Sequence, residues 1–72
     1  MNIKLDFGAM SDSLEEQANR NGYTLGKDAN RLEKIKNARA MLFLHGMLTD
    51  SENGKIIKRI SSKVEKVLKP LD

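Results

Sequence analysis

The stretch Gly46-Met47-Leu48-Thr49-Asp50-Ser51-Glu52 decides the fold, because it ends one helix and begins another within seven residues. Glycine readily adopts the left-handed conformation that closes a helix, so Gly46 marks a helix end. Thr49 and Glu52 match the capping box, in which each side chain accepts a hydrogen bond from the other residue's backbone N–H. Two helices joined by so short a turn fold back on each other. The sequence therefore predicts an antiparallel helical hairpin.

The two helices of this hairpin are expected at residues 28–45 and 50–69. The later helix is amphipathic, and Pro70 should end it. Gly54, one turn into it, suggests that a neighbour approaches closely there. Its apolar stripe comprises Ile56, Ile57, Ile60, Val64, Val67, Leu68 and Leu71. The earlier helix has an apolar stripe made of Leu32, Ile35, Ala38 and Leu42, and its last turns are apolar on every side. A helix that is apolar all round must be covered all round, by the rest of the chain or by a second subunit.

The N-terminal third adds a short helix and an extended arm. Ser and Asp at positions 11–13 are helix-capping residues, and Gly22 is a stop signal, so a helix is expected at residues 12–21, with Met10, Leu14 and Ala18 on its apolar line. Residues 2–7 alternate between apolar and polar, which is typical of a strand. No other segment alternates over five residues, so residues 1–10 should form either a packed arm, which we favour, or a strand that pairs with a second copy. In the connection after the short helix, Tyr23 and Leu25 should turn inward.

Together these patterns predict a single domain across residues 1–72 with an all-α fold. It would be a small three-helix domain built on an antiparallel helical hairpin, with a short N-terminal extended arm. A chain of 72 residues forms only a marginal core alone, and partners often supply the missing burial.

Composition excludes several function classes. The chain has no cysteine and one histidine, so thiolate metal sites and multi-histidine sites cannot form. No apolar run approaches the roughly 20 residues that span a bilayer, and the N-terminus lacks the features of a secretory signal. We therefore expect a cytoplasmic protein. His45 stands alone at a helix end, where a cap is the common role, and no catalytic constellation, cofactor motif or metal motif is present. The expectation is a non-enzymatic protein with no cofactor and no small-molecule substrate.

Two surfaces are candidates for function. The first is an apolar cluster that combines an aromatic residue with flexible methionines, a mixture common at protein interfaces: Met41, Phe43, Leu44, Met47 and Leu48. Whether these residues form an interface or ordinary core is left open by the sequence. The second is a basic face on the last helix: Lys55, Lys58, Arg59, Lys66 and Lys69. It lacks the interleaved aromatics of single-strand binders and has few base-reading residues, so a solvated face is favoured over nucleic-acid binding.

The stretch from Leu42 to Glu52, continuing to Lys58-Arg59-Ile60, resembles the helix–G-hydrophobic-hydrophobic-T-x-x-E–helix pattern of short C-terminal helical hairpin domains (SHOCT-like). The whole chain is also similar to small uncharacterised phage and prophage proteins of Gram-positive bacteria. The specific part covers under a third of the chain. This sequence departs from the hairpin domain because it stands alone and carries an extra N-terminal helix. The resemblance implies an interaction module and is compatible with self-association and a phage origin, but it transfers no functional residue.

We therefore expect a protein-binding module, with a homodimer formed through the end of the 28–45 helix and the arm as the leading case. Another protein is the second possible partner. A weak nucleic-acid-binding function of the basic face is the alternative.

Overall fold

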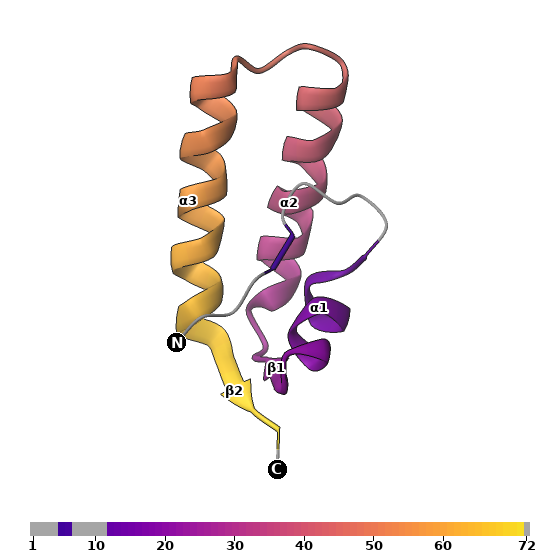
Figure 1. Cartoon of the computed structure of the whole chain (residues 1–72), viewed down its shortest axis with the longest axis vertical. Coiled ribbons are helices and arrows are strands. Elements are labelled where there is room, and N and C mark those ends of the chain that lie inside the picture. Colours follow the sequence, from indigo (N-terminus) through magenta and orange to yellow (C-terminus); the bar gives the residue numbers. More distant parts are fainter. Residues whose placement is uncertain (1–4, 7–11, 72) are drawn as a thin grey trace.

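The computed structural model describes residues 5–6 and 12–71, and its regular elements are mostly helical (Figure 1). In chain order they are α1 (Leu14–Arg20), β1 (Tyr23–Leu25), α2 (Ala29–Leu44), α3 (Asp50–Val67) and β2 (Leu68–Pro70). Figure 1 shows α2 and α3 side by side and running in opposite directions, with α1 beside the first half of α2. The far end of α2 therefore extends past α1.

Local capping chemistry sets three of the helix ends: the start of α1, the end of α2 and the start of α3. The Ser13 hydroxyl accepts a hydrogen bond from the Glu16 backbone N–H at 3.1 Å at the start of α1. Gly46 has a φ of 70° after α2. There the backbone N–H groups of Met47 and Gly46 donate to the carbonyls of Leu42 and Phe43 at 2.8 Å and 3.1 Å, which is a Schellman motif. The predicted helix end at Gly46 is confirmed.

The start of α3 is also as predicted. Both hydrogen bonds of the capping box between Thr49 and Glu52 are present. The two helices are separated by five residues, 45–49, one more than the predicted bounds left, because α2 ends at Leu44.

The fold is not purely all-α, which corrects the prediction. β1 pairs antiparallel with β2, in the register Tyr23↔Pro70, Thr24↔Lys69 and Leu25↔Leu68. The chain leaves the helix at Val67 instead of reaching residue 69, and Leu68 is already extended, with φ −71° and ψ 134°. The helical conformation is disfavoured at Lys69 because Pro70 follows it. Tertiary hydrogen bonds place the end of α3 still earlier in the chain. The Gly26 N–H donates to the Val67 carbonyl, and the Leu71 N–H donates to the Gly22 carbonyl, both at 3.0 Å.

The core lies where α1, α2 and α3 meet. Leu14, Leu32, Ile60 and Val64 are buried together, and seven partly buried apolar residues pack against them: Leu5, Leu25, Ile35, Ile56, Ile57, Val67 and Leu68. The predicted stripe of the last helix is therefore inward-facing except for Leu71, which is half exposed. Gly54 does not mark a close approach, because a Cβ there would meet no neighbouring atom within 4 Å.

The predicted stripe of α2 is only half right. Leu32 is buried and Ile35 is half-buried, but Ala38 and Leu42 are exposed. The buried positions further along α2 are Lys36, Arg39 and Ala40. Hydropathy alone would not predict that this face of α2 is buried, because burial places the two cations Lys36 and Arg39 in the interior. Their charged ends nevertheless form hydrogen bonds inside the fold.

The predicted N-terminal arm lies outside the described residues except for Leu5 and Asp6. Leu5 packs against the core. The Asp6 backbone N–H donates to the Gln17 side-chain oxygen, and the Gln17 amide donates to the Asp6 carbonyl at 3.2 Å. These two residues are therefore held by their own chain. Met10 of the predicted α1 line also lies outside the described residues, while Leu14 and Ala18 are fully buried.

Candidate interaction surface

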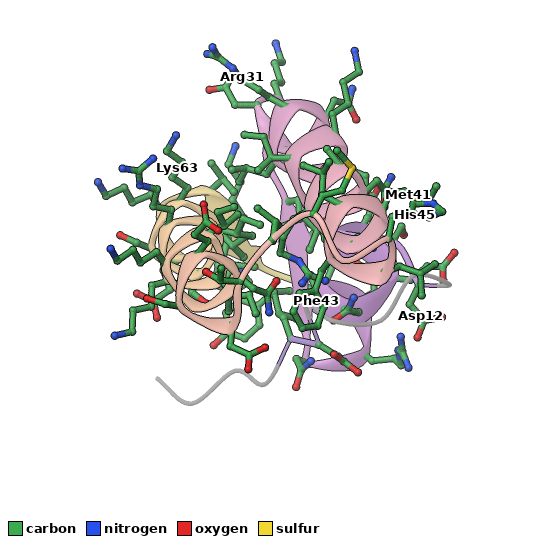
Figure 2. All side chains as sticks on the ribbon, turned by 90° about the horizontal axis from the view of Figure 1, so that it is seen from above. Asp12, Arg31, Met41, Phe43, His45 and Lys63 are labelled. Atoms are coloured by element: carbon green, nitrogen blue, oxygen red, sulfur yellow. The ribbon has the colours of Figure 1, made fainter. Side chains whose placement is uncertain are left out.

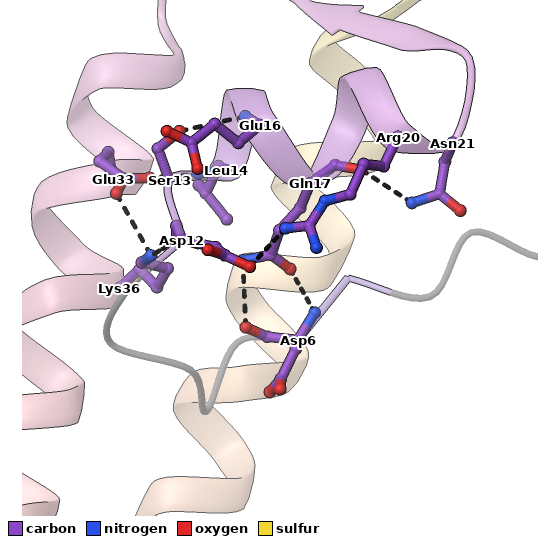
Figure 3. Close-up of polar contacts among 10 residues, drawn as sticks. All are labelled: Asp6, Asp12, Ser13, Leu14, Glu16, Gln17, Arg20, Asn21, Glu33 and Lys36. Carbon is purple, nitrogen blue, oxygen red and sulfur yellow. Dashed lines mark hydrogen bonds and ion pairs between the residues drawn. The ribbon is translucent and has the colours of Figure 1, made fainter.

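Two cations lie on the side of α2 that faces the core. Lys36 is fully buried, and its ammonium donates to the Asp12 carbonyl and lies 3.3 Å from a Glu33 carboxylate oxygen (Figure 3). The other Glu33 oxygen accepts a hydrogen bond from the Leu14 backbone N–H at 2.7 Å. Leu14 is the first residue of α1, so Glu33 satisfies one of the free N–H groups of that helix and fastens it to α2.

The second buried cation joins α2 to α3. Arg39 is almost fully buried, and its guanidinium donates to the Asn53 side-chain oxygen. The long aliphatic stems of lysine and arginine can pack like apolar side chains while their charged ends reach polar partners. Sequence reasoning missed both residues. Their positions, four and seven after Leu32, follow helical periodicity, but their charge argued against burial.

The large apolar residues in the last turn of α2, in contrast, are exposed. The exposed fractions are 46% for Met41, 38% for Leu42, 40% for Phe43 and 66% for Leu44. Met47, in the following turn, is 69% exposed, while Leu48 is half-buried. We call the six residues 41–44, 47 and 48 the apolar tip. Figure 2 shows Met41 and Phe43 on different sides of the α2 end, so the apolar surface wraps around the helix.

The structure thus brings all five residues of the predicted apolar cluster to one end of the hairpin. It leaves four of them well exposed and partly covers only Leu48. In the single chain, these four exposed residues therefore do not form ordinary core. Leu42, which the sequence placed in the inward stripe, belongs to the same surface.

The residues of the predicted basic face are all exposed, but they do not share one helix. Lys55, Lys58, Arg59 and Lys66 lie on α3, whereas Lys69 lies in β2 because the helix ends early. The prediction that Lys69 belongs to the helix is therefore wrong.

Other chemistry is sparse in the described part of the chain. His45 is exposed and forms the C-cap of α2, with its backbone N–H donating to the Met41 carbonyl at 3.1 Å. Across residues 5–6 and 12–71 no group of three or more histidine, cysteine or acidic side chains could hold a metal ion. In the same residues, no helix is both long enough and apolar enough to cross a membrane.

The chain matches no protein family, and no curated protein or solved structure is significantly similar to it. Its function must therefore be inferred from its own surfaces.

Proposed function

We propose that this chain is a non-enzymatic protein–protein interaction module that forms a homodimer through the apolar tip. The observation that carries the proposal is the run of four consecutive large apolar residues, Met41 to Leu44, each at least 38% exposed. Single exposed apolar residues are ordinary on protein surfaces, but a contiguous apolar patch is typical of an interaction site. Burying it against a partner would stabilise a small domain that has few buried apolar residues of its own.

A second copy suits the tip because residues 41–48 contain no acidic or basic side chain apart from His45. Two identical tips can therefore meet without repulsion between like charges. A twofold contact of this kind is self-complementary, which is the commonest way in which identical chains associate. The flexible methionines at positions 41 and 47 can adapt their shape to such a contact. A contribution of the N-terminal arm stays a prediction, since most of the arm lies outside the described residues.

The test is the molecular mass in solution, measured by light scattering on a size-exclusion column at micromolar to millimolar concentration. We expect a dimer of twice the chain mass of 8.1 kDa. Replacing both Leu44 and Met47 by Ser should give the monomer, because these are the two most exposed apolar side chains of the tip. The replaced side chains are on the surface, so helix content should be kept.

Leu71→Ser is the control, because Leu71 is half exposed and directly follows β2, which lies at the opposite end of the hairpin (Figure 1). It should leave the dimer intact. A wild-type monomer at high concentration would remove the proposal. A dimer that survives the tip substitutions would also refute it, because the interface would then lie elsewhere.

Nucleic-acid binding is the second candidate function. It is supported by the exposure of Lys55, Lys58, Arg59, Lys66 and Lys69, together with a net charge of +6 over residues 27–69. Charge alone supports weak, sequence-independent contact with phosphates, so we rank it second. From the resemblance to SHOCT-like hairpins and small phage proteins alone, we also propose that the chain is phage-encoded and regulatory. A cytoplasmic location stays a prediction from the sequence.

A further inference from the structure

A shallow groove of about 340 Å³ lies between the first half of α2 and the last half of α3. Three of its lining residues, Leu32, Ile35 and Val67, are apolar, and we call these three the floor. Leu32 is buried, whereas Ile35 and Val67 are only partly covered by the rest of the chain. The groove therefore exposes a strip of apolar surface between two helices, at the end of the hairpin opposite the apolar tip.

The borders of this groove are charged. Arg31 and Asp28 border it on the α2 side, and Lys63 and Lys66 on the α3 side, which leaves a net charge of +2. Figure 2 shows Arg31 and Lys63 on the same side of the helix pair. Within the described residues, no carboxylate forms an ion pair with any of the three cations. They are thus available to acidic groups from outside the chain.

We infer that this groove binds an acidic amphipathic helix of a partner protein. The apolar face of such a helix would cover Leu32, Ile35 and Val67, as in other complexes where an amphipathic helix lies in a groove. Carboxylates on its flanks would pair with Arg31 and with Lys63 or Lys66. The complementary charges would orient the helix and speed its association.

Other occupants fit these features less well. Nucleic-acid phosphates could reach the cations, but the floor has neither hydrogen-bond donors for base edges nor aromatic rings for stacking, so it would stay uncovered. The apolar tip of a second copy carries no carboxylate and would leave the cations unpaired. The groove therefore implies a partner other than the one proposed for the tip.

The probe is a short helical peptide with leucines on one face and glutamates on both flanks, compared with the same peptide carrying glutamine in place of glutamate. Titration into the ¹⁵N-labelled protein should produce saturable amide shifts at Leu32, Ile35 and Val67. The glutamine peptide should bind about tenfold more weakly, because it keeps the apolar contact but loses the charge pairing.

Charge reversal then tests the border of the groove. The double variant Arg31→Glu with Lys63→Glu should weaken binding of the acidic peptide about tenfold or more. Lys55→Glu with Lys58→Glu is the matched control, since it makes the same change in charge at exposed α3 positions that do not line the groove. All four side chains are exposed, so every variant should fold.

Three results would overturn the inference: no shift at the floor residues, equal affinity for the glutamate and glutamine peptides, or equal weakening by the two double variants. A duplex DNA that shifts the same amides at lower concentration than the peptide would show that the groove is a nucleic-acid site instead. The mass of the Arg31 and Lys63 variant in solution should match the wild type. This mass measurement distinguishes loss of peptide binding at the groove from loss of the dimer.

Discussion

At the start of α3, the Thr49 hydroxyl accepts a hydrogen bond from the Glu52 N–H at 3.1 Å, and the Glu52 carboxylate accepts one from the Thr49 N–H at 3.0 Å. The backbone hydrogen bond from Thr49, and then its side chain, hold the pKa of Glu52 below its ordinary value. A lowered pKa in the folded state means that this contact stabilises the fold above the ordinary glutamate pKa of about 4.3. That contribution is lost as the pH falls through the lowered value.

Replacing Thr49 by Ala should lower the free energy of unfolding by about 1 kcal/mol, because the first turn of α3 loses the acceptor for its backbone N–H. Chemical denaturation at neutral pH measures the change. Ser51→Ala is the control, since Ser51 is exposed in the same turn but does not cap the helix. An unchanged midpoint for the Thr49 variant would show that the capping box does not contribute to stability in solution.

Replacing Gly46 or Gly54 by alanine should change the free energy of unfolding in opposite directions. Gly46 has a φ of 70°, which an L side chain rarely adopts, so Gly46→Ala should destabilise by about 1–2 kcal/mol. Gly54 lies within α3 with open space around its Cα, so Gly54→Ala should stabilise by about 0.5–1 kcal/mol. Thermal melts of the two variants test the pair. A shift in the same direction for both would contradict the backbone conformations described above.

At the scale of elements, one carboxylate links α1 to α2. α1 is only seven residues long, too short to be stable alone. Glu33 binds both the Leu14 N–H and the buried Lys36 ammonium, which in turn holds the Asp12 carbonyl (Figure 3). This network connects the segment before α1 to the middle of α2.

Glu33→Ala should therefore destabilise the protein by about 1–3 kcal/mol, because the Leu14 N–H loses its acceptor and the buried Lys36 ammonium loses its carboxylate partner, keeping only the Asp12 carbonyl. Hydrogen exchange should show the greatest loss of protection in α1, while the first turns of α3 keep theirs. Glu65→Ala, at an exposed carboxylate of α3, is the control and should change little. Uniform loss of protection across all three helices would mean that Glu33 does not act through α1.

At the scale of the whole molecule, the apolar tip is separated from the basic side chains of α3 and of the groove. Lys55, Lys58, Arg59, Lys63 and Lys66 lie on α3, and Arg31 borders the groove, whereas residues 41–48 carry no acidic or basic side chain apart from His45. Self-association and electrostatic contacts should therefore be separable by mutation.

Binding of the chain to duplex DNA near physiological salt should be no tighter than the non-specific range of roughly 10⁻⁴ to 10⁻⁶ M and should show no sequence preference. Replacing Lys55, Arg59 and Lys66 by Gln should leave folding and the dimer intact, because all three side chains are exposed and none belongs to the tip. A shift assay at moderate salt, together with light scattering, supplies the measurements. Sequence-selective submicromolar binding that disappears in this variant would promote nucleic-acid binding to the leading function.

The sequence by itself determined the features that depend on a few neighbouring residues. Gly46 ends α2 and the Thr49–Glu52 pair begins α3 because capping hydrogen bonds join residues no more than five positions apart. The apolar stripe of α3 was readable for the same reason, since helical periodicity is local. The tip residues could also be named from composition, although their exposure could not.

Only the tertiary structure decided where α3 ends, which side of α2 is buried and that the tip stays outside. The end of α3 depends on hydrogen bonds from the segment around β1, far earlier in the chain. The burial of Lys36 depends on a carbonyl 24 positions away. Each strand is three residues long and so has no readable alternation. The groove likewise exists only where α2 meets α3. Contacts of this kind cannot be read from a local sequence pattern, because each residue is buried or hydrogen-bonded only once its distant partner has come into place.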